Sequence, residues 1–279
     1  MPKSTYYLFN FTIIMKWFRK KRNDKLKPLQ LKADALEKMQ QMPFGQSGFI
    51  RLGTHDFEFH HARCFYDTYV ELYKERMYEF KTTNQNPYII DCGANMGLSV
   101  LYFSQTYPDA EIIAFEPEPP IYELLLRNIE RYRLKNVTVY KKALWSELKT
   151  LEFFTDTGMG GSVENKFSNQ TPFTVETELL SAFITKPVDF LKIDIEGAEL
   201  TVLNECRTQL HFVRNLFVEY HSYVNKQQQL PELLQLLTDA GFRYHIKESF
   251  VHERPFIDTQ LVCENMDMAI TIFAYRNEQ

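Results

Sequence analysis

The sequence lacks the features that mark several large classes of protein. Its 279 residues include only four cysteines, with no C-x-x-C pair among them: Cys64, Cys92, Cys206 and Cys263. Neither a zinc site nor a disulfide framework is predicted, and buried free thiols are expected. Positive charge is not in excess either, since 32 Lys and Arg stand against 36 Asp and Glu. This balance disfavours a protein that binds nucleic-acid phosphates, so no nucleic-acid partner is expected.

Long apolar runs are also missing. The opening stretch YYLFNFTIIMKWFRKKR has an apolar part too short to cross a bilayer, and its basic residues follow that part, unlike those of a secretory leader. We therefore expect a cytoplasmic protein without stable membrane insertion. Peripheral binding to a membrane is the alternative, with Trp17 and the adjacent lysines and arginines at the headgroups.

After residue 87 the sequence alternates regularly between short apolar runs and helix-like segments. Strands are predicted at YII (88–90), EIIAFEP (111–117), NVTVYKKAL (136–144), VDFLKIDI (188–195), FVRNLFVEYH (212–221), FRYHIKE (242–248) and AITIFAYR (269–276). Strands and helices that alternate with short connections indicate a doubly wound α/β fold with a mostly parallel sheet. Ligands of such folds bind at the carboxyl ends of the strands.

The turn DCGANMG, from Asp91 to Gly97, joins the first of these strands to a helix. A dinucleotide-binding turn needs G-x-G-x-x-G, but the three positions hold Gly93, Asn95 and Leu98. A P-loop needs Gly-Lys-Ser/Thr at its end, and here Gly97 is followed by leucine. Both phosphate-binding motifs are absent, which disfavours an NAD-dependent oxidoreductase.

The second predicted strand supplies a carboxylate that suits a ribose. Glu116 stands nineteen positions after Gly97, where its side chain can accept hydrogen bonds from both ribose hydroxyls. A tight glycine turn followed by such an acid indicates a nucleoside without phosphates. S-adenosylmethionine is such a ligand, and the two motifs resemble the first and second motifs of class I methyltransferases.

Four ordered stretches, IIDCGANMGLSVLYFS, AFEPEP, VDFLKIDIEGAELTVL and LFVEYHS, are similar to the FkbM family of S-adenosylmethionine-dependent methyltransferases. The resemblance covers residue 88 to the C-terminus. It implies a class I, Rossmann-like, doubly wound fold with a mostly parallel sheet and an antiparallel C-terminal strand. It also implies methylation of a hydroxyl oxygen, on a sugar or on a polyketide-type natural product.

Three side chains are candidates for catalysis. Asp194 lies at the end of the strand VDFLKIDI, and Glu219 and His221 are two residues apart, so they share one face of the next strand. In the preferred hypothesis His221, oriented by Glu219, is a general base and no metal takes part. In the alternative, Asp194 and Glu219 hold a divalent metal, with or without His221. Lys192 is expected either to extend its ammonium to solvent at a sheet edge or to pair with an acid, and it receives no catalytic role.

The predicted cofactor-binding residues come from the strand ends and the loops that follow them. Ala143 lies after the third strand, where this fold places the adenine. Ser162, at the end of the Gly-rich loop 158–161, is expected to reach the same part of the cofactor. The complete set is Asp91, Gly93, Asn95, Gly97, Glu116, Ala143, Ser162 and Asp194.

The polar segment KTTNQNP, residues 81–87, is the best candidate for a domain joint. We divide the chain there into an N-terminal α/β extension, residues 1–82, and a methyltransferase domain, residues 83–279. The extension includes a helix-like run over 67–80. Because the domain already accounts for the cofactor, the extension is expected to be an acceptor lid or the contact surface of a homodimer.

The acceptor is expected to be a small molecule or glycan with a hydroxyl, a sugar first and a macrolide second. Three alternatives stay open. A methyltransferase acting on RNA finds little support in the acidic composition. An NAD-dependent oxidoreductase would bind NADH and not S-adenosylmethionine. A non-catalytic scaffold that binds S-adenosylmethionine would have no use for three ionisable groups at 194, 219 and 221.

Overall fold

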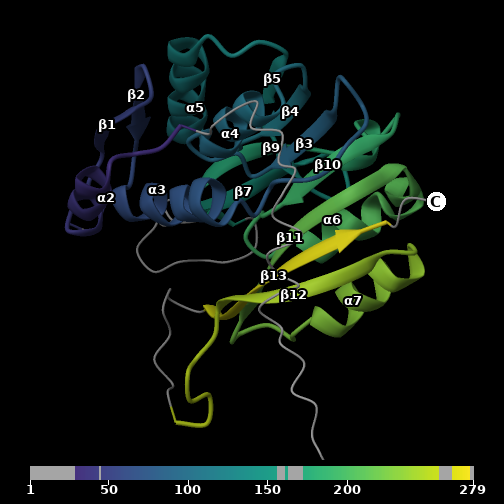
Figure 1. Cartoon of the computed structure of the whole chain (residues 1–279). Coiled ribbons are helices and arrows are strands. Elements are labelled where there is room, and N and C mark those ends of the chain that lie inside the picture. The colour runs from purple at the N-terminus through teal and green to yellow at the C-terminus, as the bar shows by residue number, and fades with distance from the viewer. Residues whose placement is uncertain (1–28, 44, 156–160, 163–171, 258–265, 277–279) are drawn as a thin grey trace, which may run out of the picture.

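The computed structural model describes residues 29–43, 45–155, 161–162, 172–257 and 266–276 (Figure 1). Its centre is a seven-stranded sheet in the order β12-β13-β11-β10-β3-β4-β5. Neighbouring strands are parallel, except that β13 runs antiparallel to β11 and β12. The strands are β3 (Tyr88–Cys92), β4 (Glu111–Phe115), β5 (Val137–Tyr140), β10 (Val188–Ile193), β11 (Val213–Tyr223), β12 (Arg243–Phe250) and β13 (Met266–Tyr275). The predicted sheet, with its antiparallel C-terminal strand, is confirmed.

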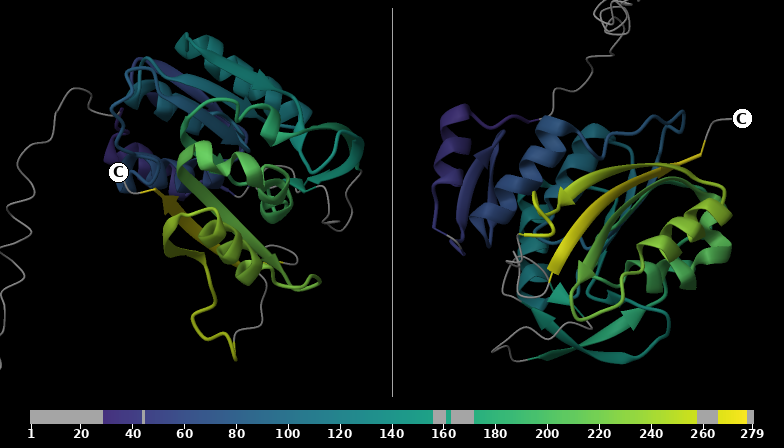
Figure 2. Two further views of the ribbon diagram at one scale, coloured as in Figure 1. Left: turned by 90° about the vertical axis from the view of Figure 1, so that its right-hand side faces the viewer. Right: turned by 90° about the horizontal axis from the view of Figure 1, so that it is seen from below.

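Helices cover both faces of this sheet, as a doubly wound fold requires. On one face lie α4 (Leu98–Thr106) and α5 (Pro119–Tyr132), and on the other α6 (Glu199–Glu205) and α7 (Leu230–Asp239) (Figure 2). The central strand β10 is buried along its whole length. Phe190 of this strand packs into the core of the first face, while Leu191 and Ile193 pack into the core of the second. A strand buried on both faces reads as a nearly continuous apolar run, which explains the sequence VDFLKI.

The N-terminal extension packs against the same face as α4 and α5. It consists of α2 (Ala33–Gln40), a hairpin of β1 (Gly48–Leu52) and β2 (His55–Phe59), α3 (Ala62–Tyr69) and a π-helix (Val70–Glu75). Its residues Phe57, Phe65 and Tyr69 belong to one hydrophobic cluster with side chains of α4 and α5. The extension therefore shares a core with the sheet, and the division after residue 82 remains a proposal.

The helix-like run predicted over 67–80 is shorter than expected and changes its geometry. The α-helix ends at Tyr69, the π-helix continues to Glu75, and Arg76 ends it in the left-handed region at φ 59°. π-Helical turns are rare and occur often at functional sites, because the wider turn redirects side chains. Glu71 and Glu75 are carried by this turn.

The segment 81–87, predicted as a joint, is tied to the amino-terminal edge of the sheet. The Oγ1 of Thr82 and the Nδ2 of Asn84 donate hydrogen bonds to the Asp189 carboxylate at 2.7 and 3.0 Å. The backbone N–H of Tyr88 donates to the same carboxylate at 3.0 Å. These bonds fix the point where the extension enters the sheet.

The chain after β5 forms a second, four-stranded sheet. It has the order β6-β9-β7-β8, formed by β6 (Ala143–Leu144), β7 (Thr150–Thr155), β8 (Gly161–Ser162) and β9 (Phe173–Glu178). The run NVTVYKKAL was expected to be one strand, but it breaks between Tyr140 and Ala143 and supplies β5 to one sheet and β6 to the other. Residues 158–160 of the Gly-rich loop lie outside the described residues.

Three cysteines are described, and all are free thiols, as predicted. Cys92 and Cys206 are buried and Cys64 is partly exposed, while Cys263 lies outside the described residues. In the described part of the chain, no helix combines the length and the apolar character that crossing a membrane requires. The opening stretch with Trp17 lies outside the described residues.

Candidate active site

A cavity of about 790 Å³ lies at the carboxyl ends of β3, β4, β10 and β11. On its other side stands a segment of the extension, residues 60–78, which we call the helical wall. The wall includes α3 and the π-helix, and it lines the cavity with His60, Arg63, Cys64, Tyr66, Asp67, Thr68, Val70, Glu71, Glu75, Met77 and Tyr78. Ligands were expected at the carboxyl ends of the strands, and the cavity lies there.

The glycine turn, residues 93–97, forms the floor of the cavity next to β3. Gly93 and Gly97 have φ of 89° and 85°, and Asn95 has φ of 48°, so three residues adopt left-handed backbone. A Cβ atom at Gly93 would lie 1.9 Å from the carbonyl oxygen of Asp194. Only glycine permits this close approach between the turn and the end of β10.

Glu116, at the end of β4, is buried and lines the cavity. Its Oε2 accepts a hydrogen bond from the backbone N–H of Asn95 at 2.9 Å, and its Oε1 accepts one from Glu118 N–H at 2.9 Å. Burial raises the pKa of this carboxyl to about 8. The two backbone bonds hold the carboxylate beside the glycine turn, where both oxygens keep further acceptor capacity.

Two residues predicted to bind the cofactor stand behind the turn and do not line the cavity. Asp91 is completely buried, and its Oδ2 accepts a hydrogen bond from Ser99 Oγ at 2.5 Å. Gly97 precedes α4, and a Cβ atom there would lie 2.3 Å from the Leu125 side chain. Both residues shape the turn, whereas Gly93 and Asn95 face the cavity.

On the far side of Glu116, Ala143 lines the cavity together with Lys142 and Leu144. Its role toward an adenine remains a prediction. The side chain of Ser162 lies outside the described residues.

Lys192 joins the glycine turn to Asp194. It is only 3% exposed, and its Nζ donates to the carbonyl oxygen of Gly93 at 2.7 Å. The same ammonium lies 3.1 Å from Asp194 Oδ2 and 3.5 Å from Asp91 Oδ1. Burial lowers the pKa of Lys192, but the carboxylates of Asp194 and Asp91 outweigh that effect and raise it. The expected pairing with an acid is confirmed, and the lysine stays charged.

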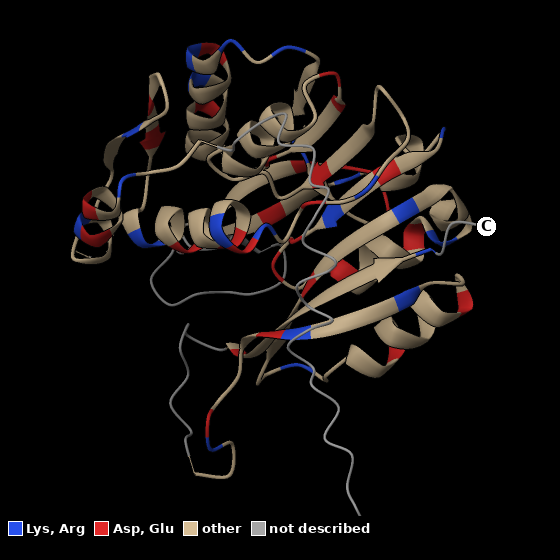
Figure 3. Cartoon of the chain, in the orientation of Figure 1, with Lys and Arg blue, Asp and Glu red and all other residues tan. Residues whose placement is uncertain are grey.

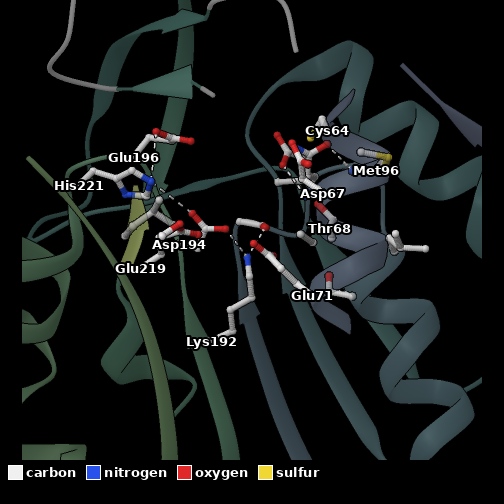
Figure 4. A pocket seen from close by; sticks show the side chains of 18 of the residues that line it. Cys64, Asp67, Thr68, Glu71, Met96, Lys192, Asp194, Glu196, Glu219 and His221 are labelled. Atoms are coloured by element: carbon white, nitrogen blue, oxygen red, sulfur yellow. Dashed lines mark hydrogen bonds and ion pairs between the residues drawn. The ribbon is translucent and has the colours of Figure 1, made fainter. Parts of the chain in front are cut away.

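The three predicted catalytic side chains come together. One ligand atom each from Asp194, Glu219 and His221 lies within 4.8 Å of the others, and all three line the cavity (Figure 4). Glu219 Oε1 accepts a hydrogen bond from Ser249 Oγ at 2.5 Å. The His221 Nε2 atom lies 4.0 Å from Asp194 Oδ1 and 3.7 Å from Glu196 Oε2.

The residue that orients His221 was predicted wrongly. Its Nδ1 lies 3.0 Å from Oε1 of Glu199, which is 1% exposed, whereas Glu219 bonds to Ser249 instead. Glu199 Oε1 also accepts the N–H of Gly197 at 2.9 Å. Glu219 was chosen because it shares a strand face with His221, but the first turn of α6 brings Glu199 closer. A carboxylate five residues after Asp194 at a helix start was the available signal.

The electrostatics of the cluster favour a protonated histidine in this state. Burial lowers the pKa of His221, but the neighbouring carboxylates of Glu196, Glu199 and Glu219 raise it well above the usual range. For Glu219, an acid, burial acts in the opposite direction and raises the pKa, and the carboxylate of Asp194 raises it further. The side chains therefore share protons within one group.

Comparison with known families identifies the chain. A family model described as "Methyltransferase FkbM domain" matches residues 91–244, from the strand before the glycine turn into β12. The chain belongs to the FkbM methyltransferase family. It is an S-adenosylmethionine-dependent methyltransferase.

Curated relatives of this FkbM methyltransferase carry related names. "Methyltransferase sdnD" of Sordaria araneosa is 30% identical over 211 residues, covering 62% of this chain and 80% of the relative. "2-O-methyltransferase NoeI" of Sinorhizobium fredii is 24% identical over 167 residues, or 52% of this chain and 68% of the relative. "Hexuronic acid methyltransferase AglP" of Haloferax volcanii is 28% identical over 155 residues, or 54% and 61%.

Proposed function

We propose that this methyltransferase transfers the methyl group of S-adenosylmethionine to a hydroxyl oxygen of a sugar. The observation that carries the proposal is the convergence of Asp194, Glu219 and His221 beside the glycine turn, in one cavity with Glu116. A hydroxyl must lose its proton when its oxygen is methylated, and this cluster offers groups that can take it.

The residues present fit the cofactor. Glu116 is held at the end of β4 with acceptor capacity toward the cavity, as a ribose diol requires, and the backbone of Gly93 and Asn95 is exposed to a close ligand. Ala143, which also lines the cavity, is assigned to the adenine. When bound, S-adenosylmethionine supplies an electrophilic methyl group on a sulfonium.

The protein aligns the acceptor oxygen and takes its proton. Bound S-adenosylmethionine would supply the methyl group and leave as S-adenosylhomocysteine, and the Asp194, Glu219 and His221 cluster would take the hydroxyl proton. An imidazolium cannot accept a proton, so His221 acts as a base only after it has lost one. The neighbouring carboxylates raise the pKa of His221, whereas the positive sulfonium of a bound cofactor would lower it. Cofactor binding therefore favours loss of this proton.

A divalent metal is the competing hypothesis for the same three side chains, because a His and two carboxylates can coordinate such an ion and acidify a hydroxyl. Dialysis against EDTA followed by a methyl-transfer assay separates the two. Full activity after EDTA supports the metal-free base. Loss of activity that magnesium or manganese restores would instead assign the cluster to a metal.

The sugar acceptor draws support from two relatives. NoeI is named a 2-O-methyltransferase and AglP a hexuronic acid methyltransferase, so transfer to oxygen and a sugar acid both occur among the names of similar chains. In this chain the helical wall faces the cluster across the cavity. We assign the wall to the acceptor, since the strand ends account for the cofactor.

Calorimetric titration with S-adenosylhomocysteine, with NADH as the control, tests the cofactor assignment. Micromolar binding of S-adenosylhomocysteine and none of NADH supports it, and the reverse would refute it. Methyl transfer from labelled S-adenosylmethionine to a panel of glycosides and hydroxylated macrolides then tests the acceptor. Transfer to macrolides alone would overturn the sugar assignment.

A further inference from the structure

Among the described residues that line the cavity, lysine and arginine side chains are few and each is already paired with a carboxylate, and the protonated His221 is bonded to Glu199. The lining contains four lysine and arginine side chains and nine aspartate and glutamate side chains. The cations and their partners are Arg63–Asp67, Lys142–Glu176, Lys192–Asp194 and Lys247–Glu75. In this part of the molecule, no lysine or arginine of the lining is left to bind an anionic ligand.

The excess of carboxylates stands on both sides of the cavity. Asp67 and Glu71 belong to the helical wall, and Asp194 and Glu219 lie at the strand ends opposite (Figure 4). Figure 3 shows acidic residues in red both on the helices of the extension and among the central strands. In Figure 4 the Glu71 side chain points from the π-helix toward Lys192 and Asp194. Burial raises the pKa of Glu71 to about 8, and the carboxylates of Glu219, Asp194 and Asp67 add to the rise. The carboxyl groups of the helical wall and those at the strand ends therefore interact across the cavity.

Above pH 8, where Glu71 is ionised, an acceptor that enters between these groups meets a negative field. A carboxylate or phosphate on the acceptor would lose its hydration without gaining a counter-ion and would repel the carboxylates already present. Sugar hydroxyls, in contrast, are donors that a carboxylate or carboxyl group accepts, and an ammonium gains an ion pair. The field thus discriminates among acceptors, because it repels anionic ones and attracts those that donate hydrogen bonds or carry positive charge.

We propose that the sugar unit methylated by this enzyme is neutral or carries an amine, that sugar acids are excluded, and that Glu71 sets this specificity by contacting the acceptor. The inference rests on the proposed sugar O-methylation. It separates this chain from the relative named a hexuronic acid methyltransferase. Glu71 is the second residue of the π-helix that follows α3.

The test compares methyl glycosides that differ only in charge. Neutral hexosides, 2-amino-2-deoxyhexosides and hexuronides, each in gluco, galacto and manno forms, are assayed with saturating S-adenosylmethionine at pH 9, where Glu71 is ionised. We expect kcat/KM for the hexuronide to be at least about 10-fold below that of its neutral counterpart, and this gap to narrow as salt rises, because salt screens repulsion. A hexuronide methylated as well as the neutral sugar would overturn the proposal.

Variants locate the effect at Glu71. Glu71→Gln is expected to reduce the ratio of kcat/KM for the neutral sugar to kcat/KM for the hexuronide by at least about 3-fold, and Glu71→Lys is expected to reduce this ratio further. The matched control is Glu79→Gln, since Glu79 pairs with Arg76 and does not line the cavity, and its preference should equal that of the wild type. An unchanged preference in both Glu71 variants would overturn the role of Glu71.

S-adenosylhomocysteine calorimetry is run on every protein. A variant that retains the wild-type dissociation constant is folded at the cofactor side, so its preference reports on the acceptor. If the wild type fails to bind S-adenosylhomocysteine, the proposed function itself fails. If it binds and transfers methyl groups to sugars without charge preference, only the present inference fails.

Discussion

The Nδ1 atom of His221 lies 3.0 Å from Oε1 of Glu199, a carboxylate at the start of α6. The Glu199 oxygen is itself held by the backbone N–H of Gly197. This arrangement fixes the ring of His221 so that its Nε2 faces Asp194 and Glu196. The orientation of the histidine is thus set from the opposite side to the reacting groups.

Replacing this carboxylate should slow the reaction without affecting cofactor binding. Glu199→Gln removes the charge and can present an amide N–H to Nδ1, which favours the wrong tautomer of His221. Turnover is expected to fall by at least about 10-fold, since a positioned base contributes about 10²–10⁴. Glu205→Gln, on the same helix but bonded to Ser181, serves as the control in steady-state assays. Equal turnover in the two variants would contradict the role of Glu199.

Cofactor affinity should depend on pH through Glu116. Burial raises the pKa of this carboxyl to about 8, and ribose hydroxyls donate best to the ionised form. Affinity for S-adenosylhomocysteine should therefore rise as pH increases, by up to about 10-fold per pH unit below 8, and level off above it. Calorimetry from pH 6 to 9 measures this slope. Glu116→Gln should bind more weakly and lack this component of the slope; an identical profile would refute the assignment.

Alanine at the two glycines of the turn should have different effects. At Gly93 a Cβ would meet the Asp194 backbone at 1.9 Å, whereas at Gly97 it would meet the movable end of the Leu125 side chain at 2.3 Å. Both changes place alanine at positive φ, which costs about 1–3 kcal/mol. We expect Gly93→Ala to abolish binding of S-adenosylhomocysteine and Gly97→Ala mainly to lower the urea midpoint. Retained affinity in Gly93→Ala would show that the turn tolerates displacement.

Lys192 should contribute to both stability and catalysis. Lys192→Met leaves Asp91 and Asp194 without their buried counter-ion, and the expected loss is about 3–5 kcal/mol in the free energy of unfolding. The double variant Lys192→Met/Asp91→Asn removes one of these charges and should recover part of the stability, as urea unfolding would measure.

Turnover separates the two contributions of Lys192. If the lysine positions Asp194, turnover at saturating substrates stays low in the double variant even where stability returns. Recovery of turnover together with stability would mean that the lysine serves the fold alone.

The fold was predictable because its signals are local. Buried parallel strands are apolar along most of their length, as VDFLKI shows, and glycines mark turns because they adopt positive φ at the least steric cost. The site at the strand ends followed from the same reasoning, since the carboxyl ends of parallel strands meet at one edge. The strand break between Tyr140 and Ala143 was missed because no glycine or proline interrupts the run NVTVYKKAL.

The contacts within the site could not be read from the sequence in the same way. Glu219 lies on the same strand as His221 and Glu199 on the preceding helix, and only the packing of α6 against β11 shows which of the two bonds to the histidine. Asp91 and Gly97 belong to the motif, but they stand behind the turn. Motif membership does not distinguish a ligand contact from a support.

By itself, the sequence determined the doubly wound sheet, the glycine turn and the family, because these depend on periodicity and on residues close together in the chain. Tertiary structure decided what the cavity is. It brings the π-helix of the extension opposite the strand ends, so that Glu71 faces Asp194 over a separation of more than a hundred residues. Electrostatic interactions depend on distance in space, and the charge of the acceptor site is therefore a property of the folded chain.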